Sequence, residues 1–200
     1  MIAESATQEQ RRLVAFYLER LGHEGPAELV DFSFAQMDPT KASTVRVARL
    51  RLPCDDGSEL CFTGSLAEVS TAVSERSDHR HLFIGTYDSS TLSLSELVAA
   101  AHHYDHAVET LGYGHTFPLG DASPLRQGGY VAALVLEASI YRFFEDVADV
   151  LYAVPTSLFS ILPISAAELA LKVDRGLDAL LDLWEQSRKD ILHVNAEVMV

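Results

Sequence analysis

Cysteine is nearly absent from the chain, which contains only Cys54 and Cys61 among its 200 residues. Two cysteines are too few for the disulfide framework of small secreted domains, so that class of protein is excluded. The pair flanks an apparent turn at residues 55–58. The two positions lie diagonally across this hairpin and not opposite each other, so we expect both thiols to stay free. With 48% apolar residues, a chain of this length can bury a core without covalent cross-links.

Positive charge and long apolar runs are also scarce. Lysine and arginine together number 15 against 29 aspartates and glutamates, which gives a net charge of −14. Phosphate binding needs clustered basic side chains, so nucleic acid is a disfavoured partner, whereas a basic protein would be attracted to this chain. The first residues lack the apolar core of a signal peptide, and no stretch reaches the roughly 20 apolar residues of a membrane span. We therefore expect a cytoplasmic protein that does not enter a membrane.

The common catalytic motifs are missing as well. We find no phosphate-binding loop, dinucleotide fingerprint or nucleophile elbow. His102 and His106 have the i, i+4 spacing that can chelate zinc, but His103 stands where a zinc protease has its glutamate, and a third ligand would have to be His115 or a carboxylate. An alternative function is therefore a metal-dependent enzyme or small-ligand-binding protein that uses these histidines. We favour the interpretation that the pair lies on a solvated helix face, and we predict no catalysis, no cofactor and no metal.

Helices are predicted at four places. The pattern Ser-x-x-Glu, which can form a capping box at a helix start, occurs at residues 65–68, 93–96 and 165–168, each time before a helical periodicity. A further stretch near the N-terminus places Leu13, Phe16, Tyr17 and Leu21 on one stripe and ends at Gly22. The predicted helices are 7–22, 66–76, 94–110 and 166–186.

Strand patterns fill the gaps between these helices. Within residues 45–52 the apolar positions change parity, which indicates a bulge or twist. The run 131–136 is wholly apolar, as expected for a central strand covered on both faces. Strict alternation of strands and helices is absent, so we predict an α+β fold in which one mixed sheet is flanked by helices. The predicted strands are 30–34, 45–52, 59–63, 82–84, 131–136, 151–154 and 158–164, with loops at 118–129 and 143–149.

One segment carries a resemblance to a known family. Residues 111–120 read Leu-Gly-Tyr-Gly-His-Thr-Phe-Pro-Leu-Gly, which resembles the Gly-aromatic-Gly-His-Thr-apolar-Pro-x-Gly signature of the Suppressor of fused domain. The resemblance continues through an apolar strand after a Gly-rich loop (128–136), a proline-containing apolar strand (158–164) and a last helix with an internal glycine (168–182). It implies a single Suppressor of fused-like domain over residues 25–186, with an N-terminal helix in 1–24 and a C-terminal tail in 187–200.

The resemblance also implies a function. Animal members of the family restrain a zinc-finger transcription factor and hold a short peptide as an added β-strand. We see no second lobe in this sequence, so we do not extend that peptide clamp to this chain. Stand-alone bacterial copies resemble immunity proteins of polymorphic toxin systems, which neutralise a partner toxin by direct binding. The family has no established catalytic site. What the resemblance implies for this acidic chain is a non-catalytic protein-binding module, which either neutralises a partner toxin or regulates another partner by direct binding. The expected partner is a protein, such as a basic toxin domain.

The signature turn admits two interpretations. Its glycines permit positive φ and close backbone approach, and His115 and Thr116 can satisfy buried polar groups, in which case the motif is structural. Alternatively, the turn is a binding feature. We favour the structural interpretation and expect the turn to pack on the sheet with a buried, hydrogen-bonded His115 ring. The residues of this structural motif are Gly112, Tyr113, Gly114, His115, Thr116 and Pro118.

The acidic segment 143–149 is the candidate partner-binding region. It places two phenylalanines beside three carboxylates, and residues 143–171 contain no lysine or arginine. Aromatic anchors next to carboxylates suit a basic protein partner. The pattern is equally compatible with a solvated loop whose phenylalanines point inward. The predicted partner-binding residues are Phe144, Glu145, Asp146 and Asp149.

Overall fold

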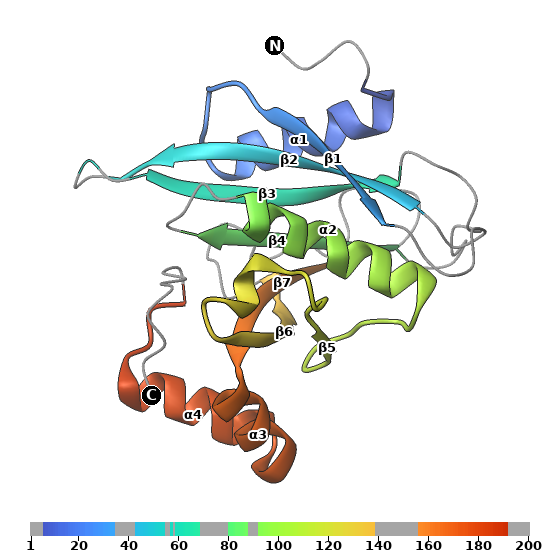
Figure 1. The fold of residues 1–200 in the computed structure, drawn as a ribbon. Coiled ribbons are helices and arrows are strands. Elements are labelled where there is room, and N and C mark those ends of the chain that lie inside the picture. Colours follow the sequence, from blue (N-terminus) through green and yellow to red (C-terminus); the bar gives the residue numbers. More distant parts are fainter. Residues whose placement is uncertain are drawn as a thin grey trace.

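The computed structural model describes residues 6–34, 43–54, 57, 59–68, 80–87, 92–138 and 156–191. Within them, seven strands form one sheet in the order β1-β2-β3-β4-β7-β6-β5 (Figure 1). Strands β4 and β7 pair in parallel, and the other five pairings are antiparallel. The predicted α+β class with a mixed sheet is therefore confirmed. The elements are α1 (Gln8–Arg20), β1 (Glu28–Phe34), β2 (Ser43–Pro53), β3 (Glu59–Glu68), β4 (Arg80–Tyr87), α2 (Leu92–Ala107), β5 (Thr116–Pro118), the 3₁₀ helix η2 (Pro124–Arg126), β6 (Tyr130–Glu137), β7 (Thr156–Ser165), α3 (Ala166–Arg175) and α4 (Leu177–Ser187).

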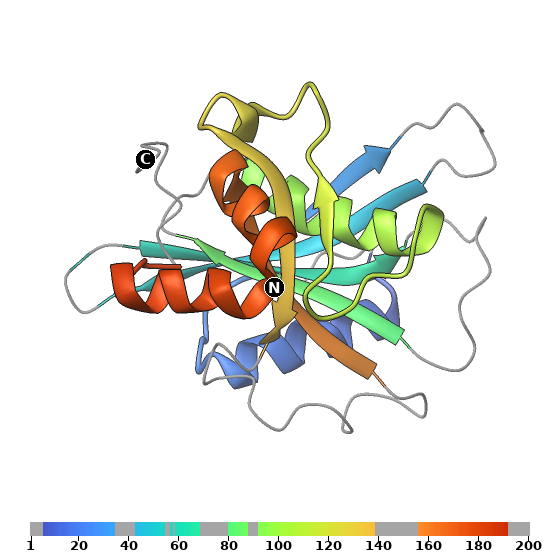
Figure 2. The same ribbon diagram turned by 90° about the horizontal axis from the view of Figure 1, so that it is seen from below.

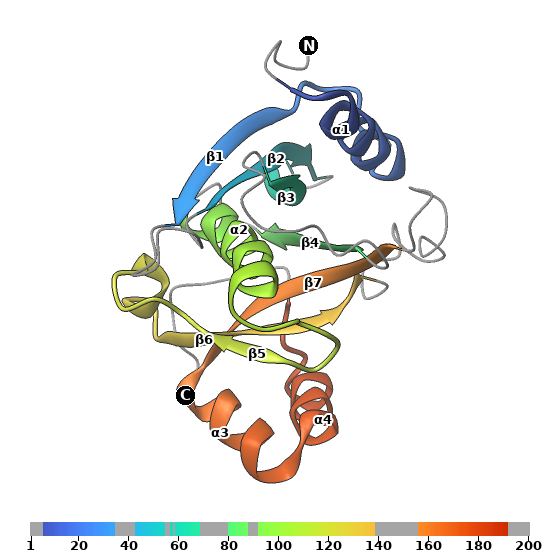
Figure 3. The same ribbon diagram turned by 90° about the vertical axis from the view of Figure 1, so that its right-hand side faces the viewer.

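Helices cover both faces of the sheet. On β4, Leu82 and Ile84 pack in a cluster with α1, whereas Phe83 between them packs with α2. On β6, Ala133 packs with α2, whereas Leu134 packs with Leu180 and other residues of α3 and α4. Since successive strand residues point to opposite faces, α1 and the α3–α4 pair share one face and α2 occupies the other. The sheet curves around α2 in Figure 3, and the view from below in Figure 2 brings α3 and α4 in front of the sheet.

The parity change in β2 follows from this layering. Val45 and Val47 pack with Ala99 of α2, whereas Ala48 and Leu50 pack with α1 on the opposite face. The apolar positions change parity because different faces of β2 are covered at its two ends. A shift in the register of β2 against β3 also occurs between Val45 and Val47, which agrees with the predicted irregularity.

The hairpin between β2 and β3 agrees with the prediction for the cysteines. Cys61 pairs with Arg51 across the two strands, and Cys54 and Cys61 are both free.

A close approach between α1 and β3 depends on a glycine. A Cβ atom built on Gly64 would lie only 2.5 Å from the Tyr17 ring, which is fully buried. The Tyr17 hydroxyl donates a hydrogen bond to the carbonyl of Ser65 at 2.9 Å. Helix α1 itself starts at a capping box between Thr7 and Gln10. The N-terminal helix is therefore an integral layer of the domain.

The three predicted helices that the structure describes have different bounds in it. Helix α1 is Gln8–Arg20 against the predicted 7–22. Helix α2 begins at Leu92, two residues before the prediction, and ends at Ala107, so Ser93 lies inside the helix and the capping box predicted at residues 93–96 is wrong. The predicted helix 166–186 is in fact two helices, because Gly176 interrupts it with a φ of 90°. The predicted capping box of α3 is confirmed: the Ser165 hydroxyl accepts a hydrogen bond from the Glu168 amide, and the Glu168 carboxylate accepts one from the Ser165 amide.

The predicted start of the helix 66–76 is wrong. Ser65 lies within β3, which continues to Glu68. Its hydroxyl accepts a hydrogen bond from the Phe83 amide of β4 at 2.9 Å and caps no helix. The serine that suggested a capping box therefore forms a hydrogen bond between two strands instead. Residues 69–76 of the prediction lie outside the described part of the chain.

The C-terminal strands confirm one prediction and correct another. Strand β6 lies between β7 and β5 and is buried from Ala132 to Leu136. Pro163 lies inside β7 and not at its end, but β4 pairs only with residues 156–160 of β7. A residue without an N–H is tolerated there because β7 has no β4 partner at that point. Just before it, the Tyr87 hydroxyl donates to the Ile161 carbonyl at 2.8 Å. The predicted strand 151–154 and loop 143–149 lie outside the described residues.

Candidate functional site

The signature turn connects α2 to β5 and is held to β6 by its backbone. The Gly114 amide donates to the Val135 carbonyl at 2.8 Å, and the Val135 amide donates to the His115 carbonyl at 2.9 Å. Gly114 has a φ of 78°, in the left-handed region that favours glycine. A Cβ atom at Gly114 would lie 3.2 Å from the side chain of Leu177. The turn therefore lies between β6 and the start of α4.

The prediction of a buried His115 ring is wrong, because the side chain is exposed. The backbone of His115 makes the structural contacts: its amide donates to the Gly112 carbonyl at 3.0 Å, and its carbonyl joins β6. The turn satisfies its polar groups with backbone hydrogen bonds, so it does not require the imidazole. Tyr113, between the two glycines, is also exposed.

Strand β5 is an end strand of the sheet, and we call its three residues the β5 edge. In an antiparallel ladder, successive residues direct their backbone groups to opposite sides. The His115 carbonyl and the Leu119 amide are both bonded to β6, the latter at 3.0 Å from the Val131 carbonyl. By alternation, the backbone groups of Thr116 and Pro118 point away from β6. Thr116 thus presents an N–H and a carbonyl to a further strand, and Pro118 presents only a carbonyl.

Four large apolar side chains are exposed in the described residues. Val108 is 57% exposed and Tyr113 is 51% exposed, both in the connection from α2 to β5. Val173 on α3 is 76% exposed, and Leu183 on α4 is 43% exposed. The turn that contains Tyr113 approaches Leu177 at the start of α4.

A buried carboxylate anchors the connection from α2 to β5. Asp105, only 4% exposed, accepts hydrogen bonds from the Leu111 amide at 2.7 Å and pairs with His81 Nδ1 of β4 at 2.9 Å. Burial alone would raise the pKa of Asp105, but these bonds and the nearby histidines lower it overall, so the carboxylate is charged. Our sequence analysis did not single out Asp105. The sequence feature that could have revealed its burial is its position one turn after Ala101, on the apolar stripe of α2.

His102 and His103 of α2 lie in the core, whereas His106 is only half-buried, so the expected solvated face of the His102–His106 pair was wrong for His102. His102 is 2% exposed, and its ring lies edge-on to Phe83 with centroids 6.1 Å apart. His103 is stacked on Phe34 of β1 at 4.8 Å. The rings of His102 and His106 lie 4.8 Å apart. Helix α2 is covered by strands on this side because the sheet curves around it.

The structure does not assemble the metal site of the alternative function. It brings His102 and His106 together, but among the described residues no group of three His, Cys, Asp or Glu side chains could hold a metal ion. The predicted partner-binding residues Phe144, Glu145, Asp146 and Asp149 lie outside the described residues.

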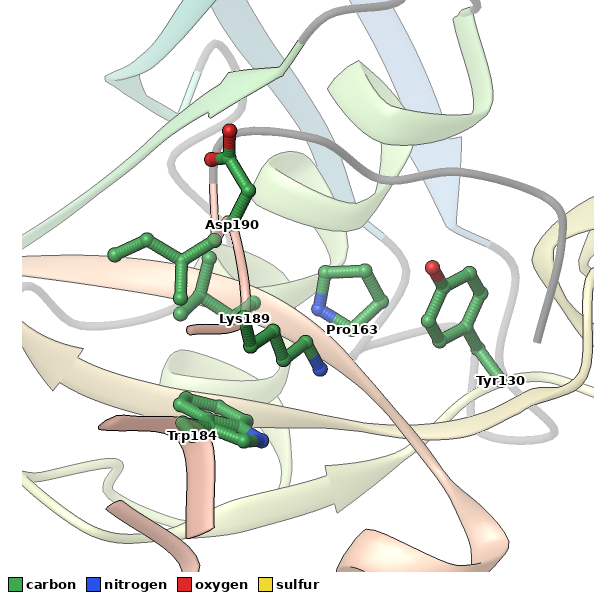
Figure 4. Close-up of a pocket in the computed structure, with 7 residues that line it drawn as sticks. Tyr130, Pro163, Trp184, Lys189 and Asp190 are labelled. Atoms are coloured by element: carbon green, nitrogen blue, oxygen red, sulfur yellow. The ribbon is translucent and has the colours of Figure 1, made fainter. Parts of the chain in front are cut away.

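A second polar cluster locks α3 to α4. The Glu168 carboxylate accepts hydrogen bonds from Trp184 Nε1 at 2.7 Å and from Lys189 Nζ, in addition to the Ser165 amide at 2.8 Å. Lys189 Nζ also lies 4.4 Å from the centre of the Trp184 ring (Figure 4). Burial alone would raise the pKa of Glu168, but the hydrogen bonds from Lys189 and the Ser165 amide lower it overall.

A small hollow lies beside this cluster. It is lined by Tyr130, Leu162, Pro163, Trp184, Lys189, Asp190 and Ile191. Its cavity volume of about 10 Å³ is enough for one water molecule, whereas small-molecule sites occupy roughly 300–1,000 Å³. The hollow is therefore no substrate pocket.

No helix in the described part of the chain is long and apolar enough to cross a membrane.

Comparison with known proteins gives one family and several similar folds. The family model described as Suppressor of fused protein (SUFU) matches residues 51–195. No curated protein matches the chain. A protein from Neisseria gonorrhoeae FA 1090, described as a SUFU homologue, shares 13% identity over 98% of this chain and 100% of its own, with a TM-score of 0.62.

Two further solved structures are similar. Drosophila Suppressor of Fused has 12% identity and a TM-score of 0.62 over 98% of this chain, which spans about half (52%) of that protein. A structure described as the Sufu-Fu complex has 10% identity and a TM-score of 0.60, covering 95% of this chain and 91% of that one. At these identities the likeness shows the fold.

Proposed function

Since this chain belongs to the Suppressor of fused family, we propose that it is a non-catalytic module that binds another protein. Its specific role, in this proposal, is that of a cytoplasmic immunity protein, which neutralises a partner toxin by direct contact. The observation that carries the proposal is the β5 edge, where backbone groups point outward beside exposed apolar side chains. The Sufu-Fu complex is named for an assembly with a protein partner, and a binding role is extended from it to this chain only as a proposal.

The β5 edge suits an extended segment of a partner. Thr116 offers a donor and an acceptor to a strand added beside it, and main-chain hydrogen bonds of this kind supply affinity in strand addition. Tyr113 lies at one end of the edge, half exposed. Pro118 at the other end limits the added ladder to a short stretch, which also protects the free protein against uncontrolled edge-to-edge pairing.

Charge favours a basic partner. The net charge of −14 raises the encounter rate with a positively charged protein, and this effect fades as salt screens it. The acidic segment with Glu145, Asp146 and Asp149 remains our proposal for the steering surface, and Phe144 for an anchor. In this proposal, steering sets the association rate, and the apolar contacts at the edge set the lifetime of the complex.

The test uses two substitutions at one position. Thr116→Pro removes the outward N–H and leaves the hydrogen bonds to β6 in place, whereas Thr116→Val keeps the N–H and the side-chain shape. The first partner to test is the C-terminal domain of the protein encoded beside this gene, by calorimetry and by survival of cells that express it. We expect Thr116→Pro to weaken binding about tenfold or more, the cost of one lost hydrogen bond, and Thr116→Val to bind like the wild type.

Each part of the proposal has its own contrary outcome. Equal binding by both variants would overturn the β5 edge as the contact surface. A complex with a protein that does not harm cells would overturn the immunity role and keep the binding role. The absence of any stoichiometric partner, both with the neighbouring protein and in a pull-down from the source cytoplasm, would overturn protein binding itself.

A further inference from the structure

We propose that residues 192–200 add as a strand to the β5 edge of the same chain and cover it until a partner displaces them. The occupant of the edge in the free protein is then a segment of this chain, which we call the 192–200 segment. Its docking is a property of the free protein. The consequence for partner binding rests on the function proposed above.

The 192–200 segment has the sequence pattern of a β-strand. Its even positions, from Leu192 to Val200, are all apolar, and three of its four odd positions are polar. Alternation of this kind is typical of a strand with one covered face. The segment contains one carboxylate, Glu197, and no lysine, arginine, proline or glycine. Such a stretch is an aggregation hazard when its backbone is unpaired, so a docking site on its own chain protects it.

The last described residue lies beside the strand that carries the β5 edge. Ile191 packs in the cluster formed by α3, α4, β6 and β7, and it lines the small hollow together with Tyr130, the first residue of β6 (Figure 4). The next residue of β6, Val131, accepts a hydrogen bond from the amide of Leu119, which directly follows β5. The 192–200 segment therefore starts near the Pro118 end of the β5 edge.

Chain length selects the β5 edge over the β1 edge. Neighbouring strands lie about 4.8 Å apart and an extended residue spans about 3.3 Å, so the path from β6 to a new strand beyond β5 uses about three residues. About six of the nine residues then remain for a β5 edge that is three residues long. A new strand beyond β1 lies six strand spacings from β6. That path of about 29 Å uses the whole segment and leaves nothing to form a ladder.

The direction of the 192–200 segment fits the edge as well. A segment that starts near Pro118 and runs toward Thr116 is antiparallel to β5. In an antiparallel pair of this phase, the outward N–H and carbonyl of Thr116 bond to the same residue of the added strand. The sheet is covered by helices on both faces at β6, so an added strand can place its apolar positions on a face that is already apolar.

Attachment to the same chain compensates for the short ladder. A short linker gives a tethered segment an effective concentration on the order of 1 mM, so contacts too weak to hold a free peptide can hold this segment. The 192–200 segment lacks basic side chains, and the net charge of −14 does not attract it. A basic partner gains that attraction, and this difference makes the segment a displaceable cover.

Amide hydrogen exchange of Thr116, followed by NMR on the full-length free protein, tests the docking without any partner. Val194→Ser with Val198→Ser removes apolar groups of one parity, and His193→Ser with Asn195→Ser is the matched control of the other parity. We expect the Thr116 amide to exchange about tenfold or more faster in the first variant than in the wild type, the effect of one lost hydrogen bond. The control should exchange like the wild type.

The Leu119 amide is the internal reference, because it is bonded to Val131 of β6 and should stay protected in every variant. Three outcomes would overturn the docking. These are exchange of Thr116 that is as fast in the wild type as in the first variant, an equal acceleration in the matched control, and an acceleration that includes Leu119, which would show that β5 itself has loosened.

Partner binding separates this inference from the proposed function. If the segment covers the edge, Val194→Ser with Val198→Ser should bind the partner several-fold more tightly than the wild type, because a larger fraction of the free protein has an open edge. A protected Thr116 in a protein without any partner would count against the proposed function and support the docking. A protected Thr116 with equal partner binding by wild type and variant would support the docking and place the partner away from the β5 edge.

Discussion

At one end of the sheet β1 pairs with β2 along seven residues, and at the other end β5 pairs with β6 along three. The long end strand carries cross-strand ion pairs: Arg46 binds both oxygens of Asp31 at 2.6 and 2.7 Å, and Arg49 binds Glu28 at 2.7 Å. The large apolar side chains that are exposed in the described residues lie instead on α3, on α4 and beside β5. Charged pairs on an edge strand discourage another strand from pairing with it, whereas exposed apolar groups favour contact with other molecules.

This difference agrees with the binding surface that we propose at the β5 end. The β1 end is covered by α1 and carries charged pairs, which discourage other strands from pairing with it. The β5 end is held by a few polar anchors, chiefly Asp105 and Glu168, and exposed apolar side chains lie in the connection that leads to it. Three substitutions test this contrast, one in the packing of the β1 end, one in an anchor of the opposite end, and one in the charges of the β1 edge.

The largest effect is expected for Gly64→Ala. The added methyl group would meet the buried Tyr17 ring, which has no room to move, and overpacking of this kind costs roughly 3 kcal/mol. Urea unfolding measures the loss, and hydrogen exchange should show the loosening in α1 first and in α3–α4 last. Gly112→Ala is the matched control, because a Cβ there meets nothing within 4 Å. Equal stability of the two variants would show that α1 does not seal this end tightly.

A smaller effect, about 2 kcal/mol at neutral pH, is expected for Glu168→Gln, which loses the charged partner of Lys189. The wild-type contribution of Glu168 is present above its ordinary pKa of 4.5 and is lost as the pH falls through its lower pKa in the folded protein. Unfolding free energies measured between pH 6 and pH 3 should therefore decline less steeply in the variant. Glu185→Gln, on the exposed surface of α4, is the control. Parallel curves for wild type and Glu168→Gln would show that the Glu168 carboxylate does not anchor α3 to α4.

The smallest effect on stability is expected for Asp31→Asn. This half-exposed pair contributes less than about 1 kcal/mol, but its loss removes charge from the β1 edge. We therefore expect near-normal unfolding together with increased self-association, measured by light scattering at rising protein concentration. Asp121→Asn removes the same charge beyond β5 and should leave association unchanged. If both variants associate equally, net charge and not the β1 edge keeps the chains apart.

Local patterns predicted the elements whose contacts are local. The Ser165–Glu168 box succeeded because both partners lie in the same turn. The identical pattern at residues 65–68 failed because Ser65 is bonded to Phe83 in a strand that is 18 residues away. Strand β5 was missed because three residues ending in proline carry no alternation. Gly176 was recognised as an internal glycine, but the break it causes depends on a positive φ that the helical pattern does not reveal.

The candidate site was harder to predict than the fold. The signature at residues 111–120 was expected to be structural, and its backbone is indeed bonded to β6, but the expected role of the His115 ring was wrong, because the backbone of His115 makes the bonds. The outward direction of the Thr116 N–H depends on the hydrogen bonds of its neighbours to β6. The sequence alone does not show which residues of the strand direct their backbone groups to β6. The role of Asp105 depends on Leu111 and His81 at once, and His81 lies 24 residues away on another element.

The parallel pairing of β4 with β7 affects the rate at which the protein folds. It joins Arg80 to Thr156, more than seventy residues apart, whereas β2–β3 and β5–β6 are pairings between strands close in the chain. Closing so long a loop has an entropy cost that is recovered only when the pairing is complete. We therefore expect the antiparallel β1–β3 unit to form early, even while the rest of the chain is being synthesised, and the β4–β7 seam to form last. A newly made chain would acquire its rigid end first, and the local β5–β6 pair would join the rest of the sheet only when the β4–β7 seam closes.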